Sequence, residues 1–75
     1  MGISKFEAAR RASGMSNVEA AKIAGFKEPT MYTREDDPGS WRLRELARIY
    51  RELDGTGRGL LLAAMADFCE NADLT

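Results

Sequence analysis

The sequence has no histidine, one cysteine, two prolines and no long apolar run. Histidine is the commonest general base and the commonest metal ligand, and a single cysteine cannot close an internal disulfide. The apolar stretches fall well short of the roughly 20 residues that cross a bilayer. We therefore expect a non-enzymatic protein without a metal, another cofactor, a small-molecule ligand or a membrane association.

An excess of positive charge is also missing. The net charge is −1, whereas proteins that bind DNA are usually basic. The charge is unevenly distributed, because residues 1–34 contain six bases and three acids, a net of +3, while residues 35–54 and 55–75 each have a net of −2. Any surface for nucleic acid is therefore expected in the N-terminal half.

The length of 75 residues accommodates a single domain, residues 1–75. Residues 1–20 lack the apolar core of a secretory signal, so we expect a cytoplasmic protein. The one cysteine, Cys69, stands among Ala66, Phe68 and Ala72. Such an apolar setting is typical of a cysteine in a core or an interface.

Glycine and proline divide the chain into short segments without the alternation of β-branched residues that strands show, which favours an all-α fold. Ser16 and Glu19 form the capping-box pattern that opens a helix, Gly25 ends that helix, and Pro29 fits the first turn of the next one. The expected helices cover residues 3–13, 17–24, 28–36, 41–53 and 59–71.

The fourth expected helix, 41–53, is amphipathic. Its arginines other than Arg42 are expected on an ordinary solvated face, and Trp41 is expected to anchor the core rather than to stack on bases. The apolar face comprises Leu43, Leu46, Ile49, Tyr50 and Leu53. The glycine-rich residues 55–59 resemble a phosphate-binding loop only faintly, since no strand precedes them and the lysine is missing, so we expect a flexible linker.

Residues 20–26 carry the features of a tight turn between two crossing helices. Ala21 is small where a second helix would cross, and Gly25 can adopt the positive φ that a sharp turn needs. Phe26 and Met31 would then anchor the second helix on the core. This pattern predicts the helix, turn and helix unit that places a recognition helix in the major groove of DNA.

Between about Phe6 and Leu53 the chain resembles the phage repressor and Cro-like (XRE-type) helix-turn-helix family. The residues that carry the resemblance are Arg10, Gly14 to Asn17, Glu19 to Ala21, Gly25 and Glu35. The resemblance implies an all-α, five-helix, lambda-repressor-like domain in which the second and third helices form the helix-turn-helix and residues 1–54 form the core. It also implies a structural ion pair between Arg10 and Glu35.

The same resemblance implies the residues that touch DNA. Those that face the bases are Glu28, Pro29, Tyr32 and Thr33, and those that hold phosphates are Asn17, Lys27, Arg34 and Arg42. Glu28 can only accept a hydrogen bond and Pro29 donates none, so we expect sparse direct readout, with a contribution from DNA shape.

The last segment, residues 55–75, is expected to form a linker and a C-terminal helix. Apolar residues occupy more than one face of that helix, which predicts a homodimer through Leu61, Met65 and Phe68; the alternative is a helix buried entirely within the core. The function expected is a sequence-specific regulator of transcription that binds double-stranded DNA, similar to a repressor of a phage or mobile element. The alternative is a protein-interaction module, such as an antitoxin or anti-repressor, with weak or lost DNA binding.

Overall fold

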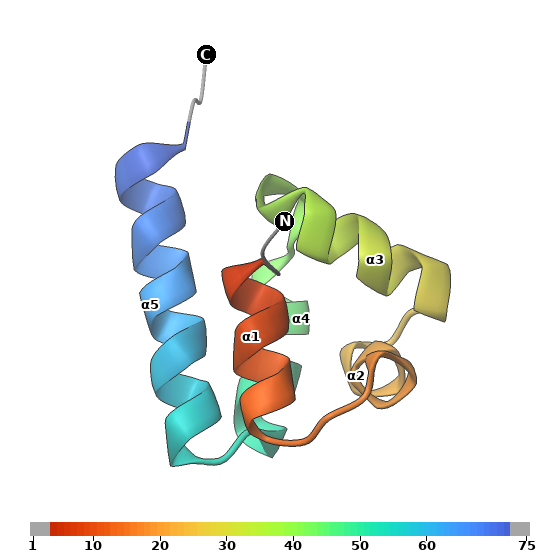
Figure 1. The fold of residues 1–75 in the computed structure, drawn as a ribbon. Helices are drawn as coiled ribbons and strands as arrows, with labels where there is room; N and C mark the ends of the chain where they lie inside the picture. The colour runs from red at the N-terminus through yellow and green to blue at the C-terminus, as the bar shows by residue number, and fades with distance from the viewer. Residues whose placement is uncertain (1–3, 73–75) are drawn as a thin grey trace.

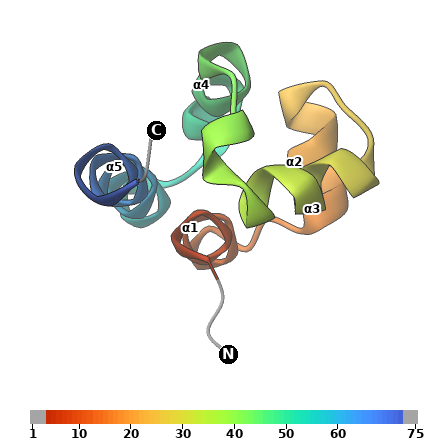
Figure 2. The ribbon, with the colours of Figure 1, turned by 90° about the horizontal axis from the view of Figure 1, so that it is seen from above.

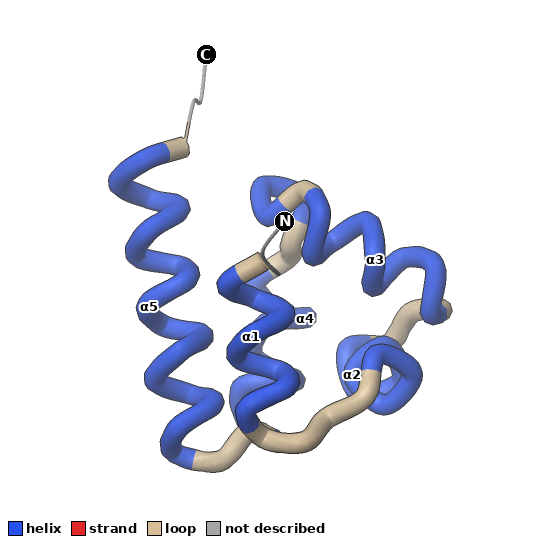
Figure 3. Tube along the Cα trace, viewed as in Figure 1, coloured by secondary structure: helices blue, strands red, loops and turns tan. Residues whose placement is uncertain are grey.

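The structure, a computed structural model, describes residues 4–72 of the chain. These residues form five α-helices, one 3₁₀ turn and no strand, which confirms the all-α expectation (Figures 1 and 3). The elements are α1 Lys5–Ala12, α2 Asn17–Ala24, α3 Glu28–Asp36, η1 Pro38–Ser40, α4 Leu43–Glu52 and α5 Gly55–Asn71. Ile3, the expected start of the first helix, lies outside the described residues.

Local capping explains where α1 and α2 begin and end. The Ser4 hydroxyl accepts a hydrogen bond from the Glu7 N–H at 3.0 Å. The Ser16 hydroxyl accepts from the Glu19 N–H at 3.1 Å, and the Glu19 carboxylate accepts from the Ser16 N–H at 3.4 Å, which confirms the expected capping box. Gly25 ends α2 in the left-handed conformation, with φ of 95°.

The expected linker at residues 55–59 is wrong, because α5 already begins at Gly55. The carboxylate of Asp54 caps the helix by accepting from the Gly57 N–H at 2.8 Å, and the Ser13 hydroxyl donates to the same carboxylate at 3.0 Å. These two hydrogen bonds lower the pKa of Asp54. A side chain at Gly57 would overlap the Ser13 hydroxyl, so the glycine permits a close approach of α5 to α1.

The fourth helix is shorter than expected, because it begins at Leu43, after η1 and Arg42, rather than at Trp41. Leu46, Ile49 and Leu53 are buried as expected, but Leu43 is 77% exposed, so its place on the buried face is wrong. On a helix of 3.6 residues per turn, Leu43 shares a row with Ala47 and Tyr50, which lies beside the buried row. That row faces the side of α5 rather than the centre of the core.

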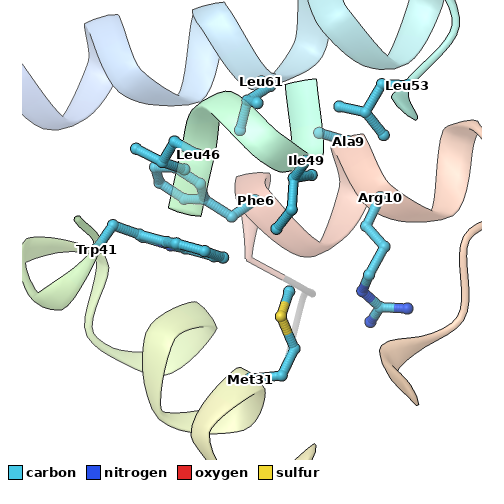
Figure 4. A pocket seen from close by; sticks show the side chains of 9 residues that line it. All are labelled: Phe6, Ala9, Arg10, Met31, Trp41, Leu46, Ile49, Leu53 and Leu61. Atoms are coloured by element: carbon cyan, nitrogen blue, oxygen red, sulfur yellow. The ribbon is translucent and has the colours of Figure 1, made fainter. Parts of the chain in front are cut away.

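The core lies where α1, α4 and α5 meet, with α1 packed along α5 and α3 closing one side (Figures 1 and 2). Figure 4 shows its side chains around a cavity of about 10 Å³, which is about the volume of one water-sized probe. The lining is apolar apart from Arg10 and comprises Phe6, Ala9, Met31, Trp41, Leu46, Ile49, Leu53 and Leu61. None of the helices in residues 4–72 has the length and apolar content that a membrane span requires.

Candidate nucleic-acid interface

Helices α2 and α3 are joined by a three-residue turn and cross one another. Figure 1 views α2 along its axis while α3 runs across the page. The turn is fixed by two backbone hydrogen bonds to the Ala21 carbonyl, from Gly25 at 2.9 Å and from Phe26 at 3.0 Å. Ala20, Ala21 and Ala24 are all buried, and their small side chains allow the close packing of α2.

Helix α3 has one anchored face and one exposed face. Met31 and Glu35 are 2% and 5% exposed and attach the helix to the core. The four residues expected to face bases lie together on the exposed side: Glu28, Pro29, Tyr32 and Thr33. Tyr32 is 58% exposed. Because residues three and four apart share a helix face, these side chains form one continuous surface.

Two hydrogen bonds order the polar groups on this surface. The Tyr32 hydroxyl donates to the Glu28 carboxylate at 3.4 Å, and the Thr33 hydroxyl donates to the Pro29 carbonyl at 3.3 Å. Each bond joins residues four apart on α3. The hydroxyls of Tyr32 and Thr33 therefore remain available as acceptors, as does the carboxylate of Glu28.

The structure brings Arg10 and Glu35 together as an ion pair between α1 and α3. Arg10 Nε lies 3.0 Å from Glu35 Oε2, and the two side chains are 9% and 6% exposed. A second Arg10 nitrogen, Nη2, donates to Glu35 Oε1 at 3.4 Å, and Nη1 donates to the Met15 carbonyl at 3.0 Å. Because every nitrogen of this buried guanidinium has a partner, the charge is compensated.

Arg34, for which the sequence predicts a phosphate contact, has a different partner in the structure. Its Nε and Nη2 donate to the two carboxylate oxygens of Glu45 at 2.9 and 3.2 Å, and its guanidinium lies 5.5 Å from the centre of the Phe26 ring. Both partners are largely buried, with side-chain exposures of 16% for Arg34 and 8% for Glu45. Because Glu45 of α4 binds the Arg34 guanidinium through both carboxylate oxygens, the guanidinium is not presented to a phosphate. The predicted phosphate contact of Arg34 is therefore corrected.

The pKa of Glu45 reflects this environment. Burial alone would raise the pKa, but hydrogen bonds from the Arg34 guanidinium and the Arg42 N–H outweigh burial and hold it below its usual value. The same hydrogen bond from Arg34 to Glu45 raises the pKa of Arg34. Both groups are therefore stabilised in their charged forms.

The other three expected phosphate contacts differ in accessibility. Lys27 and Arg42 are exposed. Lys27 precedes α3, and Arg42 lies near the other end of α3 because its backbone N–H donates to the Glu45 carboxylate at 3.0 Å, the group that also binds Arg34. Asn17 does not present its side chain, since both amide atoms are buried and have no hydrogen-bond partner among the described residues. The expected phosphate contact of Asn17 is therefore not available in this arrangement.

Internal ion pairs reduce the positive charge that the N-terminal half presents. Besides Arg10 and Arg34, Lys5 pairs with an acid outside residues 1–34, Asp67, at 2.8 Å; the Arg11–Glu7 pair, also at 2.8 Å, is already counted in the net of +3. The hydrogen bond from Lys5 lowers the pKa of Asp67. The net charge of +3 in residues 1–34 therefore overstates the positive charge that this part of the surface presents to a partner. Lys22 and Lys27 are exposed and belong to that charge.

The predicted dimer residues of α5 do not share one environment. Leu61 is 3% exposed and belongs to the core, because α5 packs on α1 through Gly57, Leu61 and Ala64, so its predicted place in a dimer contact is wrong. Met65 and Phe68 are half-buried, and Cys69 is exposed rather than buried in this chain. Both neighbours of Leu61 are exposed, Leu60 at 40% and Leu62 at 51%.

An apolar groove of about 220 Å³ lies between α4 and α5. We call it the α4–α5 groove; its lining comprises Leu43, Leu46, Ala47, Tyr50, Leu61, Leu62 and Met65. A second hollow, of about 180 Å³, shares Leu43, Leu46 and Met65 with it and continues to Trp41, Phe68 and Cys69. The sequence predicted an apolar surface on α5, but the structure adds a contribution from α4.

Further contacts around α4 involve Trp41, Arg48 and Arg58. Trp41 is half-buried, with its ring centre 6.0 Å from that of Phe6 and 6.2 Å from that of Phe26, so it packs against the core as expected. Sequence reasoning missed Arg48, which donates to the Ala24 carbonyl at 2.9 Å, and Arg58, which donates to the carbonyls of Tyr50 and Arg51 at 3.0 and 3.1 Å. No local signal identifies the contact of Arg48, since its partner is 24 residues away.

The described residues contain no group of three or more cysteine, aspartate or glutamate side chains that could hold a metal ion. Comparisons of the chain with protein-family models, with curated proteins and with solved structures find no match.

Proposed function

We propose that this protein is a sequence-specific DNA-binding regulator of the helix-turn-helix type, in which α3 is the recognition helix. The observation that carries the proposal is the exposed face of α3. Tyr32 is 58% exposed while Met31, the residue before it, is 2% exposed, and the side chains of Pro29, Tyr32 and Thr33 have no role in the core. A rigid helix that follows a short turn and presents such a face is suited to the major groove.

Contacts with the DNA backbone would come from Lys27 and Arg42, which are exposed and lie near opposite ends of α3. Base readout would come from Glu28, which can accept from a cytosine amine, and from Tyr32 and Thr33. Pro29 supplies only apolar contact. With so few donors, shape and deformability of the DNA contribute to specificity.

The proposal includes a homodimer formed through the α4–α5 groove, with Leu43 and Leu62 at its centre. A two-fold interface brings the same patch of both copies together, so the patch needs a protrusion and a hollow that fit one another. Leu43 and the α4–α5 groove beside it supply such a pair, and both are apolar. A dimer of this kind would read two half-sites about one turn of DNA apart. The protein would act in the cytoplasm by occupying an operator, as the resemblance to phage repressors and Cro-like proteins implies.

The second candidate function is a protein-interaction module such as an antitoxin or anti-repressor. The α4–α5 groove favours it, since an apolar groove also accepts an amphipathic helix of another protein. The acid Glu28 on the exposed face of α3 is consistent with weak DNA binding.

The test is a selection of binding sites from random duplex DNA at moderate salt, followed by a salt titration of the best site. We expect one enriched motif and an affinity that falls linearly with the logarithm of the salt concentration. No enrichment and no salt dependence would reject DNA binding. Sedimentation of wild type and Leu62→Glu tests the dimer: a dimer for the former and a monomer for the latter are expected, and monomers in both cases would reject it.

A further inference from the structure

Besides packing against α2 through the core, helix α4 makes polar contacts with the α2–α3 unit at two separate points. The first point is the C-terminal turn of α3, where Arg34 donates twice to Glu45, at 2.9 and 3.2 Å. The same carboxylate accepts from the Arg42 N–H at 3.0 Å, so it is tied to the first turn of α4 as well. The position of Glu45 is therefore fixed from both sides.

The second point is the turn that leads into α3. Arg48 Nη1 donates to the carbonyl of Ala24, the last residue of α2, at 2.9 Å. A cation at the carbonyl end of a helix is favoured by the helix dipole. The guanidinium also occupies the space beside Gly25, since a Cβ on that glycine would lie only 2.7 Å from Nη1. Gly25 thus supplies both the positive φ of the turn and room for Arg48.

The two contacts come from one rigid element. Glu45 and Arg48 are three residues apart and therefore share a side of α4, and Leu46 and Ile49 beside them are 8% and 4% exposed. Apolar burial holds α3 less firmly, because Met31 is its only buried apolar residue within the described range. The orientation of α3 consequently depends on polar contacts, which are the Arg10–Glu35 pair with α1 and the contacts of α4 at the end of α3 and at its preceding turn.

We propose that Glu45 and Arg48 are positioning residues that set the orientation of α3 from α4, acting through Arg34 at one end and through the Ala24 carbonyl at the other. We call this arrangement the two-point clamp. It rests on the proposed function for its effect on DNA, but its structural part does not. Neither residue contacts bases: the clamp improves specificity by restricting the angles at which the exposed face of α3 enters the groove.

The test uses Arg48→Met, which keeps much of the aliphatic stem and removes the donors, and Glu45→Gln, which removes the charge. Arg44→Met is the matched control, because Arg44 is exposed on the same helix and its side chain has no hydrogen bond or ion pair among the described residues. Arg48→Lys retains a donor and a charge and should behave as wild type. Glu45→Gln keeps the test valid if Arg48→Met fails to fold.

The first readout is the ratio of affinities for the selected site and for random duplex. We expect Arg48→Met and Glu45→Gln to lower this ratio about tenfold and Arg44→Met to leave it unchanged; for Arg48→Met the affinity for random duplex and the salt dependence should also stay unchanged. Equal loss for both duplexes, with a salt slope reduced by about one, would instead identify Arg48 as a phosphate contact and overturn the clamp.

The second readout is amide hydrogen exchange in the free protein, which separates the clamp from DNA binding. We expect exchange to accelerate about tenfold at Phe26 and along α3 in both clamp variants, while α1 and α5 exchange as in wild type. If wild type selects no DNA and this local acceleration is still seen, the proposed function fails and the clamp stands. Unchanged exchange along α3 in well-folded Arg48→Met and Glu45→Gln would overturn the clamp.

Discussion

Helices α3 and α5 carry the two surfaces on which the proposed function depends, and they are attached to the molecule in opposite ways. Helix α3 is attached mainly by charge, through the Arg10–Glu35 and Arg34–Glu45 ion pairs, with Met31 as its buried apolar anchor. Helix α5 is attached mainly by apolar packing on α1, through Leu61, Ala64 and the close approach at Gly57. The outer surfaces differ in the same sense, since α3 exposes mostly polar groups and α5 exposes leucines.

This contrast has a physical consequence. Ion pairs with bidentate geometry fix both distance and angle, whereas apolar packing fixes mainly distance and area. A helix that must enter a groove of DNA at a defined angle benefits from the first kind of attachment. A helix that contributes to an apolar groove for a partner is adequately held by the second.

The largest effect is expected when the attachment of α3 to α1 is broken. Arg10→Met leaves the carboxylate of Glu35 buried and unpaired, and removing one partner of a buried ion pair costs about 3–5 kcal/mol. Urea unfolding measures this loss. Arg11→Met is the control, because its ion pair with Glu7 leaves Arg11 61% exposed and should contribute no more than about 0.5 kcal/mol. Similar small losses in both variants would remove the structural role given to the Arg10–Glu35 pair.

A comparable truncation on α5 tests the apolar attachment. Leu61→Ala should cost about 3 kcal/mol of unfolding free energy, because the side chain is 3% exposed and its removal enlarges the core cavity. Leu62→Ala, at a position that is 51% exposed, should leave the stability of the monomer nearly unchanged. Thermal unfolding under conditions where the protein is monomeric would distinguish the two, and a larger loss for Leu62→Ala would show that the register of α5 is different.

These two positions also show how far sequence reasoning reaches. The capping box at Ser16, the turn at Gly25 and the bounds of α3 were predictable because each depends on residues a few positions apart. The register of α5 was not, because the sequence is apolar around much of the helix and the choice between Leu61 and Leu62 depends on where Gly57 meets α1. A signal did exist in Asp54, which is a good N-cap three residues before Gly57.

The candidate site was predictable in part for the same reason. Spacing along one helix groups Glu28, Tyr32 and Thr33 without knowledge of the rest of the fold. The partners of Arg34 and Arg48 lie 11 and 24 residues away, so nothing local distinguishes these arginines from solvated ones. Distant pairing therefore removed one predicted phosphate contact and supplied the two-point clamp.

A smaller effect on stability is expected from pH, through the Arg34–Glu45 pair that attaches α3 to α4. The folded-state pKa of Glu45 is lowered, so this carboxylate contributes stability that is fully present above its unfolded pKa of about 4.3 and is lost as pH falls through the lower folded value. Below pH 5, wild type should therefore lose stability more steeply than Glu45→Gln. Urea unfolding from pH 7 to pH 3 measures the two curves, with Glu52→Gln, an exposed position on α4, as the control. Parallel curves for wild type and Glu45→Gln would contradict this assignment.

The central claim, that the exposed face of α3 reads DNA, is tested most directly by titrating the isotopically labelled protein with the selected duplex and following backbone amide resonances. The account predicts that the largest changes fall on Lys27, Glu28, residues 30–33 and Arg42, while the amides lining the α4–α5 groove change little. Changes confined to the α4–α5 groove, or no changes along α3, would contradict it.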